Sequence, residues 1–378
     1  MVYNYSNIEF KENFKMKVLK SIFALVLCLA LSVTCLVGCH EKGEIAVKIG
    51  DVEFTSGYYA CALVFSDSAA RTKVEEALSE DSSLAAEIDY YAQKVENKDF
   101  ETWVRENTLN TLKDIAAVKT LCKEANFDLD AETAALAEDE STYLWQSYGY
   151  AALLEPNGVS EQTFKEYMRD SYLMDEYFEF LYGKGGKKEI AADKISKQLT
   201  DNYVLVNKLE ASFTSDTKDE EKADKKELFA KLEKELKEGT KTFEQAYLEY
   251  NNIKEEDHKH EDPKEGETLP KDQHASVLGS EDTSYASDHF TTAKGMTVGE
   301  VKVITLEKDA GLVLLVKKDI SADPYYLEQF DLILRDEIEG ENYSKDIEEY
   351  GKKLECTVND FSIEQFDVEE IVYPTTTY

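Results

Sequence analysis

The stretch Tyr203-Val-Leu-Val-Asn-Lys-Leu-Glu-Ala-Ser-Phe213 decides the fold, because the sequence pattern changes there. Before it, apolar residues recur mainly at three- and four-residue steps, which is typical of helices. The stretch itself is a β-rich run, and further runs of this kind follow it. The 378-residue chain is therefore predicted to combine a helical part with a part of mixed strands and helices, which is an α+β fold.

The segment 45–200 is predicted to be a helical bundle with one small strand pair. The strand pair is expected at Ile45–Phe54, where apolar and polar residues alternate around a turn at Gly50-Asp51. One amphipathic helix is clear at Phe100–Cys122, where the apolar residues form a single stripe. The other helices are expected at about 55–78, at about 131–150, and from Ser160, which is placed to cap its helix, to the run Gly183–Gly186.

Strands and helices mix in the segment 201–322. Thr242 and Gln245 have the spacing of a capping box, which predicts the start of a helix. Residues 251–275 are acidic, polar and of low complexity, and they predict a flexible loop. The other expected elements are a charged helix at about 218–238 and strands at 301–305 and 311–317.

The C-terminal segment 323–378 is predicted to be mainly helical. Pro324 begins a helix that is expected to end at about Glu339. A second helix is expected near 343–353, followed by a strand-like run at 354–359 and a loose tail.

The N-terminal segment has the features of an export signal. Lys17 and Lys20 precede Ser21–Val37, a run without charge, which gives the basic and the apolar region of a signal peptide. Leu36-Val37-Gly38-Cys39 closes it and resembles the lipobox of bacterial lipoproteins. The resemblance implies cleavage after Gly38, lipid on the thiol of Cys39, and attachment to the extracytoplasmic face of the cell membrane. The alternative is an uncleaved anchor, since the uncharged run has the minimum length of a membrane span.

The charge and the cysteines exclude several classes of function. A formal net charge of −35 repels nucleic acid, so no nucleic-acid partner is expected. Cys61, Cys122 and Cys356 match neither a disulfide framework nor a metal-binding spacing, and we expect them to act as small buried hydrophobes. The sequence contains no Gly-rich phosphate loop and no Gly-x-Ser-x-Gly motif.

With these parts in order, the chain resembles the PrsA and SurA class of extracytoplasmic foldases. In the helical part the resemblance rests on Val47–Gly57, the helix with Trp103, Asn157–Ser160 and Tyr182-Gly183. In the α+β part it rests on Glu238-Gly239 with Thr242–Ala246, Leu278-Gly279, Phe290, Gly295 and Val298–Val301.

The resemblance implies a helical chaperone domain, formed by N- and C-terminal segments, around an inserted parvulin-type peptidyl-prolyl isomerase domain. The implied boundaries are a signal peptide at 1–38, an N-terminal helical segment at 39–200, a parvulin-like domain at 201–322 and a C-terminal segment at 323–378. It further implies that the partners are unfolded or nascent exported proteins, and that oligomers can form.

Parvulins carry two histidines that face each other across the proline pocket, and this chain departs from that pattern. The first position falls near Ser212 and Phe213 and the second near Val313, and none of these is a histidine. We therefore expect weak or absent isomerase activity, with no confident catalytic residue. The alternatives are an active isomerase that uses other residues and a solute-binding lipoprotein of a transporter, although the latter class needs repeated β-α units.

Three histidines, His258, His260 and His274, fall in or beside the predicted acidic loop. Imidazole is a ligand for zinc or copper, so they are weak candidates for a metal site. A solvated loop with histidines placed by chance explains them as well, and we favour this interpretation. No metal and no cofactor is expected.

Aromatic residues are the candidates for binding unfolded clients, because they offer a large contact area at a low entropic cost. Packing inside the helical bundle is the alternative role for each of them. The client-binding candidates are Tyr143, Trp145, Tyr148, Tyr177 and Phe178.

Overall fold

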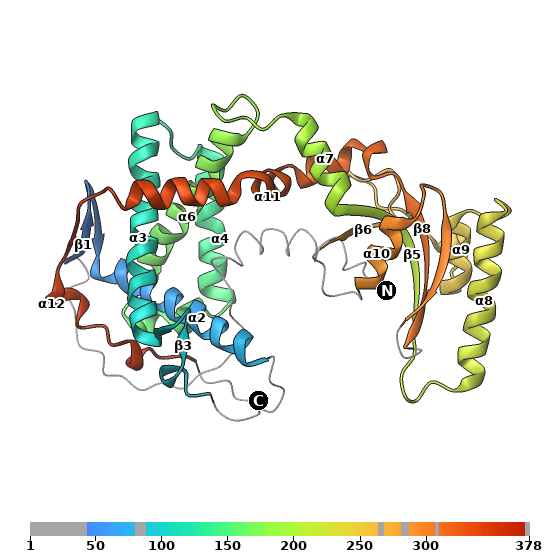
Figure 1. The fold of residues 1–378 in the computed structure, drawn as a ribbon, viewed down its shortest axis with the longest axis horizontal. Coiled ribbons are helices and arrows are strands. Elements are labelled where there is room, and N and C mark those ends of the chain that lie inside the picture. Colours follow the sequence, from blue (N-terminus) through green and yellow to red (C-terminus); the bar gives the residue numbers. More distant parts are fainter. Residues whose placement is uncertain (1–43, 80–87, 264–267, 281–286, 307–309, 375–378) are drawn as a thin grey trace. The chain divides into compact units, whose positions relative to one another are not determined.

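The computed structural model describes residues 44–79, 88–263, 268–280, 287–306 and 310–374 (Figure 1). The export signal and Cys39 lie outside the described residues. The chain divides into two compact units: unit 1 takes its residues from Met1–Glu189 and Glu339–Tyr378, and unit 2 is Ile190–Ile338. Both units contain helices and strands, which confirms the predicted mixture of the two.

The helical part of unit 1 follows the predicted pattern closely. Ser160 caps its helix as expected, because its side chain accepts a hydrogen bond from the backbone N–H of Thr163. The helices are α2 (Ser56–Ser79), α3 (Phe100–Ala125), α4 (Ala131–Ser147), α5 (Tyr150–Leu154) and α6 (Glu161–Tyr182).

The core of unit 1 surrounds α2. Its first half is buried on all sides, from Tyr58 to Phe65, and it packs with Phe100 of α3 and Phe164 of α6. Asp170 of α6 is also buried in this region. Its carboxylate accepts hydrogen bonds from the Tyr58 hydroxyl (2.8 Å) and from the Lys119 ammonium (2.8 and 2.9 Å). The buried charge is thus paired and ties three helices together.

A three-stranded antiparallel sheet joins the two ends of unit 1. The predicted hairpin is present as β1 (Ile45–Ile49) and β2 (Val52–Thr55). The third strand, β9 (Cys356–Val358), pairs with the other edge of β1, a pairing that the sequence pattern did not predict. A second hairpin, β3 (Lys94–Val95) with β4 (Lys98–Asp99), was also not predicted.

The C-terminal segment differs from the prediction in two respects. One continuous helix, α11 (Pro324–Gly351), replaces the two expected helices, because a single glycine inside a helix costs only about 1 kcal/mol and packing overrides it. The tail is not loose. Val368 is fully buried in unit 1, and the Tyr373 hydroxyl donates a hydrogen bond to Asp67 of α2 (2.6 Å).

Unit 2 is built on a four-stranded antiparallel sheet. Its order is β6-β5-β8-β7, so the first strand of the unit lies between the second and the fourth. The strands are β5 (Tyr203–Ser212), β6 (Ala275–Gly279), β7 (Val301–Thr305) and β8 (Gly311–Lys318). The helices are α7 (Ala192–Asn202), α8 (Asp219–Lys237), α9 (Phe243–Asn251), α10 (Ser287–Gly295) and the start of α11.

The two faces of this sheet bury different side chains. Leu209, Leu312 and Leu314 pack with α8 and α9, whereas Val206 and Val313 pack with α10. Neighbouring strand residues alternate between these two clusters, as strand geometry requires. The predicted capping box of α9 is present in both directions between Thr242 and Gln245.

The predicted loop at 251–275 needs a correction. Its described residues include the end of α9, a 3₁₀ turn at Glu255–Asp257 and the first residue of β6. Both β6 and α10 were missed by sequence analysis. Among the described residues, no helix is both long and apolar enough to cross a membrane.

The junction of α3 and α11 in unit 1 contains a half-buried carboxyl group, that of Asp114. A Cβ atom on Gly351 would lie 2.9 Å from the carbonyl oxygen of Lys113, so the two helices approach closely here. Burial raises the pKa of Asp114 to about 7, and the negative charge of Glu348 adds to the shift. A raised pKa in the folded state means that stability falls as the pH rises from about 4 to about 7 and stays at its lower value above that.

Replacing this carboxyl by an amide should therefore stabilise unit 1 in a pH-dependent manner. We expect Asp114→Asn to raise the free energy of unfolding by roughly 2 kcal/mol at pH 8 and to change it little at pH 4. Urea unfolding followed by tryptophan fluorescence measures this, because both tryptophans, Trp103 and Trp145, lie in unit 1. Asp139→Asn, at an exposed position of α4, is the control. An equal gain at both pH values would contradict the assignment.

Candidate functional site in unit 2

The positions at which the resemblance to parvulins implies two facing histidines do not line a common pocket. Val313 is fully buried in the α10 cluster, and its partner across the β5–β8 pair is Glu210. Ser212 is exposed and lies opposite Gly311, while Phe213 packs with the α8 and α9 cluster. These three residues thus lack an imidazole and also fall in different surroundings.

The α10 side of the sheet is apolar around Val313. Its buried neighbours are Val206, Leu315 and Met296, with Phe290 of α10 packed against them. Such a cluster offers no group that could hydrogen-bond to the nitrogen or the oxygen of an amide. His289 of α10 is a buried histidine that the sequence analysis did not single out.

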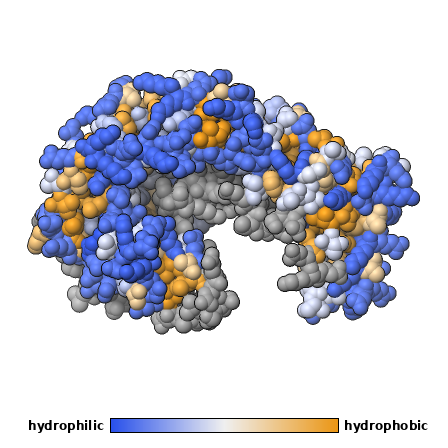
Figure 2. Space-filling model, viewed as in Figure 1, coloured by the Kyte–Doolittle hydropathy of each residue, from blue (hydrophilic) through white to orange (hydrophobic). Residues whose placement is uncertain are grey.

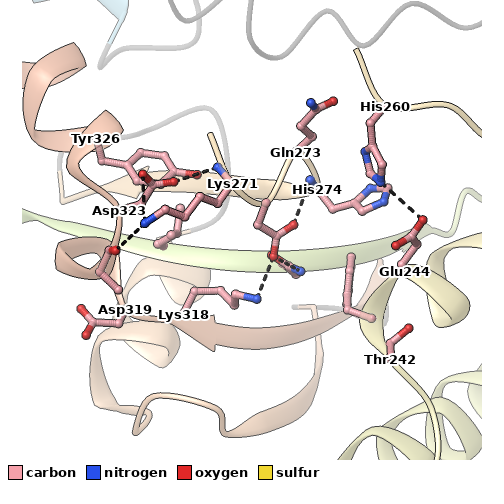
Figure 3. Close-up of a pocket in the computed structure, with 15 residues that line it drawn as sticks. Thr242, Glu244, His260, Lys271, Gln273, His274, Lys318, Asp319, Asp323 and Tyr326 are labelled. Atoms are coloured by element: carbon pink, nitrogen blue, oxygen red, sulfur yellow. Dashed lines mark hydrogen bonds and ion pairs between the residues drawn. The ribbon is translucent and has the colours of Figure 1, made fainter. Parts of the chain in front are cut away.

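A cavity of unit 2 lies beside α9, and Figure 3 shows the side chains that line it. It has a volume of about 510 Å³. Most of the residues that line it are polar or charged, with both signs of charge present, and Leu205, Phe243 and Tyr326 supply apolar surface. The other lining residues include Asn207, Glu244, His260, Lys271, Asp272, His274, Lys318 and Asp323.

A polar network crosses the floor of this cavity from β5 to β8. Asn207 is buried and donates a hydrogen bond from Nδ2 to Asp272 Oδ2 (3.0 Å). Lys318 Nζ lies 2.7 Å from the same carboxylate oxygen. Burial opposes ionisation of Asp272, but these two partners outweigh it and hold its pKa below the usual value. The carboxylate is therefore ionised and paired at neutral pH.

A second set of contacts closes the other end of the cavity. The backbone N–H of Lys271 donates to Asp323 Oδ2 (2.8 Å), and the Lys271 side chain donates to the carbonyl oxygen of Ala322 (3.1 Å). Within each of the two networks, the charged groups are thus held by contacts with other groups of the protein. This arrangement favours the binding of a polar ligand or a structural role over nucleophilic catalysis, which requires a nucleophile beside a base.

The predicted loop histidines do not behave as isolated residues of a solvated loop. His258, His260 and His274 lie together, and Glu244 of α9 joins them. The structure thus brings the three weak metal candidates to one point, which the sequence did not predict. Glu244 was missed because it belongs to a different element, and nothing in its local sequence distinguishes it from the other acidic residues.

The five aromatic candidates for client binding separate into two groups. Trp145, Tyr177 and Phe178 are at most 6% exposed, so they belong to the core of unit 1 and cannot serve as surface contacts. Tyr143 and Tyr148 are 56% and 49% exposed, and their ring centroids are 5.3 Å apart. Figure 2 shows a mainly hydrophilic face on which hydrophobic residues gather in separate patches.

No protein-family model matches this chain, and no curated protein matches it. The chain shows a remote likeness to several solved structures, and among them are three foldase proteins named PrsA. The protein from Streptococcus pneumoniae strain Canada MDR_19A is 14% identical with a TM-score of 0.36, over 69% of this chain and 92% of that one. The protein from Lactococcus lactis is 12% identical with a TM-score of 0.36, over 86% and 99%. The protein from Bacillus subtilis is 12% identical with a TM-score of 0.28, over 70% and 90%.

Proposed function

We propose that this protein is a lipid-anchored folding factor on the extracytoplasmic face of the membrane, where it holds exported polypeptides while they are unfolded. The anchor is the thiol of Cys39, at the end of the export signal. Unit 2 is a parvulin-like domain with weak or no isomerase activity in this proposal. Its apolar sheet face and its polar cavity have structural or binding roles.

The observation that carries the proposal is the interrupted course of the chain. Unit 1 is assembled from residues on both sides of Ile190–Ile338, and that inserted unit has an antiparallel sheet of order β6-β5-β8-β7. A helical body around a small inserted α+β unit is the architecture that the sequence resemblance to the PrsA and SurA class implies. The order of the sequence motifs and the course of the chain therefore support the same architecture.

The chemistry around Val313 supports the loss of isomerase activity. Rotation about an X–Pro bond has to cross a barrier that is of the order of 18–20 kcal/mol for peptide bonds. A catalyst lowers it with polar groups directed at the amide. The α10 cluster presents Val206, Val313 and Leu315 instead. The histidines of the α9 side contact Tyr247, which belongs to the other cluster, so they are no substitute.

The strand pairing disfavours the alternative of a solute-binding lipoprotein. Proteins of that class are built from repeated β-α units, which give parallel sheets. Every strand pair in the described part of this chain is antiparallel. We therefore retain the holding function as the conclusion.

Two assays on the same preparation separate a holding protein from an isomerase. We expect the protein to suppress aggregation of a denatured client at near-stoichiometric amounts. We expect it to leave the rate of a proline-limited refolding reaction unchanged at substoichiometric amounts. Aggregation is measured by light scattering and refolding by fluorescence. Faster refolding at a molar ratio well below one would show that unit 2 is an active isomerase, and full aggregation would reject the holding function.

The exposed tyrosine pair at the C-terminal end of α4 should contribute to client binding. We expect the double variant Tyr143→Ser, Tyr148→Ser to bind an unfolded client roughly thirtyfold more weakly, since each aromatic contact is worth about 1 kcal/mol. Fluorescence anisotropy with a labelled unfolded client measures the affinity. Phe361→Ser is the matched control, because Phe361 is 71% exposed elsewhere in unit 1. Equal weakening by the control would show that the tyrosine pair has no special role.

A further inference from the structure

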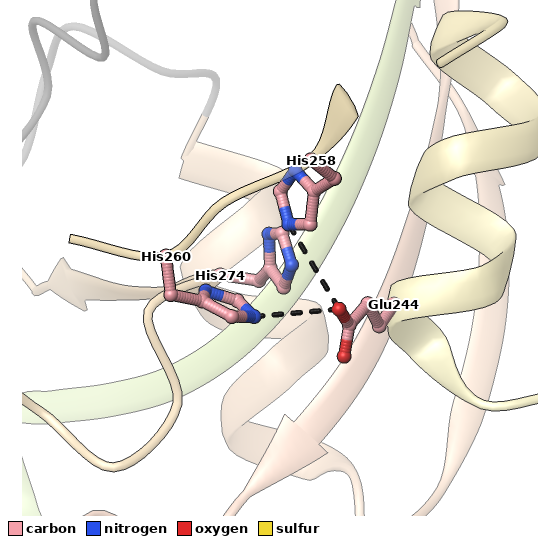
Figure 4. Close-up of side chains that lie close together, drawn as sticks. All are labelled: Glu244, His258, His260 and His274. Atoms are coloured by element: carbon pink, nitrogen blue, oxygen red, sulfur yellow. Dashed lines mark ion pairs between the residues drawn. The ribbon is translucent and has the colours of Figure 1, made fainter. Parts of the chain in front are cut away.

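Four side chains that can bind metal ions converge beside α9. Figure 4 shows the imidazoles of His258, His260 and His274 gathered next to the carboxylate of Glu244, which extends from α9. Each residue offers one ligand atom, and these four atoms all lie within 4.8 Å of one another. The four residues come from three separate parts of unit 2: α9, the segment after the 3₁₀ turn, and the residue before β6.

The separations are close to those of an occupied tetrahedral site. With zinc–ligand distances of about 2.0–2.2 Å, the ligand atoms of a tetrahedral zinc ion are roughly 3.4 Å apart. His260 Nε2 lies 3.4 Å from Glu244 Oε1, and His258 Nε2 lies 3.9 Å from the same oxygen. Small rotations of these side chains would complete the geometry.

Contacts around the cluster hold the imidazoles in place. The rings of His258 and His274 stack at 5.1 Å, and Tyr247 of α9 lies 4.4 Å from the His274 ring. Gln273 ties the two histidine segments together. Its side-chain oxygen accepts from the backbone N–H of Glu261, and its amide nitrogen donates to the carbonyl oxygen of Glu261, both at 2.8 Å.

Two of the imidazole nitrogens lack the partners that buried polar atoms normally have. The Nε2 atoms of His258 and His274 are buried and have no hydrogen-bond partner among the residues that the structure describes.

We propose that Glu244, His258, His260 and His274 bind one divalent transition-metal ion, and that Zn²⁺ is the ion that fits best. Three imidazoles and one carboxylate match the nitrogen and oxygen ligands of zinc, whereas calcium and magnesium prefer sites made of oxygen alone. Four protein ligands fill a tetrahedral shell and leave no position for a reacting water. The site is therefore structural, not hydrolytic.

The surroundings favour the capture of a cation. Asp257 directly precedes His258 and Glu261 directly follows His260 in the sequence, and both acidic residues are exposed. The chain as a whole carries a formal net charge of −35, which raises the local concentration of cations. Glu244, His260 and His274 also line the cavity beside α9, so the ion would lie at one end of that cavity.

A bound ion would join segments that the sequence alone predicted to be a flexible loop. It would fix His258, His260 and His274 to Glu244 of α9, because all four residues would share one ion. An ion that binds only the folded state also stabilises unit 2 by mass action. The contact of these histidines with α9 would thus depend on the metal content of the medium.

Zinc binding by the purified full-length protein, in detergent and without a polyhistidine tag, tests the proposal. We expect one Zn²⁺ per chain by elemental analysis after dialysis, and an affinity measured by competition with a chromophoric chelator. His258→Gln, His260→Gln and His274→Gln should each weaken binding at least about tenfold, since even the loss of a residue that orients a ligand costs 10- to 100-fold. Glu256→Gln and Lys259→Gln are the controls, because they change a charge in the same segment outside the cluster.

Three results would overturn the proposal. One is no zinc after dialysis. Another is zinc that the histidine variants retain, which would point to unspecific binding by the acidic surface. The third is equal retention of Ca²⁺ or Mg²⁺. Substitution by Co²⁺ gives an independent test, since four-coordinate cobalt absorbs visible light much more strongly than six-coordinate cobalt. His260 has a 42% exposed side chain, so its variant is the one best able to fold if the other two do not.

Limited proteolysis provides a readout of the structural consequence. Lys259 is exposed and lies between two of the proposed ligands, so trypsin can cleave after it. We expect Zn²⁺ to slow this cleavage in the wild-type protein and in Glu256→Gln, but not in His274→Gln. Gln273→Ala should show an intermediate effect, because Gln273 positions the histidine segments without binding the ion. Cleavage at an unchanged rate in the wild-type protein would show that the ion does not order the segment.

Discussion

The pairing of β9 with β1 is the constraint on which the course of the chain depends. Val47 lies opposite Val358, and the backbone N–H of Gly50 donates to the carbonyl oxygen of Glu355 (2.8 Å). Because a strand from the C-terminal segment completes a sheet begun in the N-terminal segment, the two segments of unit 1 are held together on either side of the inserted unit. Tyr373 strengthens this closure by reaching Asp67 of α2.

In unit 2, an apolar cluster and a cavity with a polar network lie on opposite sides of one sheet. Val206 and Val313 point to the α10 side, where the cluster is apolar, while Asn207 reaches the cavity beside α9. Since neighbouring strand residues face opposite sides, a polar network and an apolar cluster can share β5 without meeting. The imidazoles of this unit that sequence analysis singled out all lie on the α9 side.

Sequence periodicity predicted the elements that bury a long regular face, and it failed where distant segments decide the structure. α3 follows the stripe that includes Phe100, Val104 and Leu112, and Thr242 with Gln245 marks the start of α9. β9 has only three residues and exists because β1 offers it an edge. α11 is one continuous helix from Pro324 to Gly351, where the sequence pattern predicted two. The histidine cluster depends on α9, which no local pattern connects with the acidic segment.

The acidic segment illustrates why composition alone misjudges order. Low hydrophobicity means that 251–275 cannot bury enough apolar surface to offset the entropy of ordering it. A few specific contacts can offset that entropy instead. Gln273 satisfies both backbone groups of Glu261, and Tyr247 covers two imidazole rings. Exposed ion pairs contribute little to such ordering, because water and salt screen them. The described residues on either side of the acidic stretch are therefore ordered by a few directional contacts, which residue composition does not reveal.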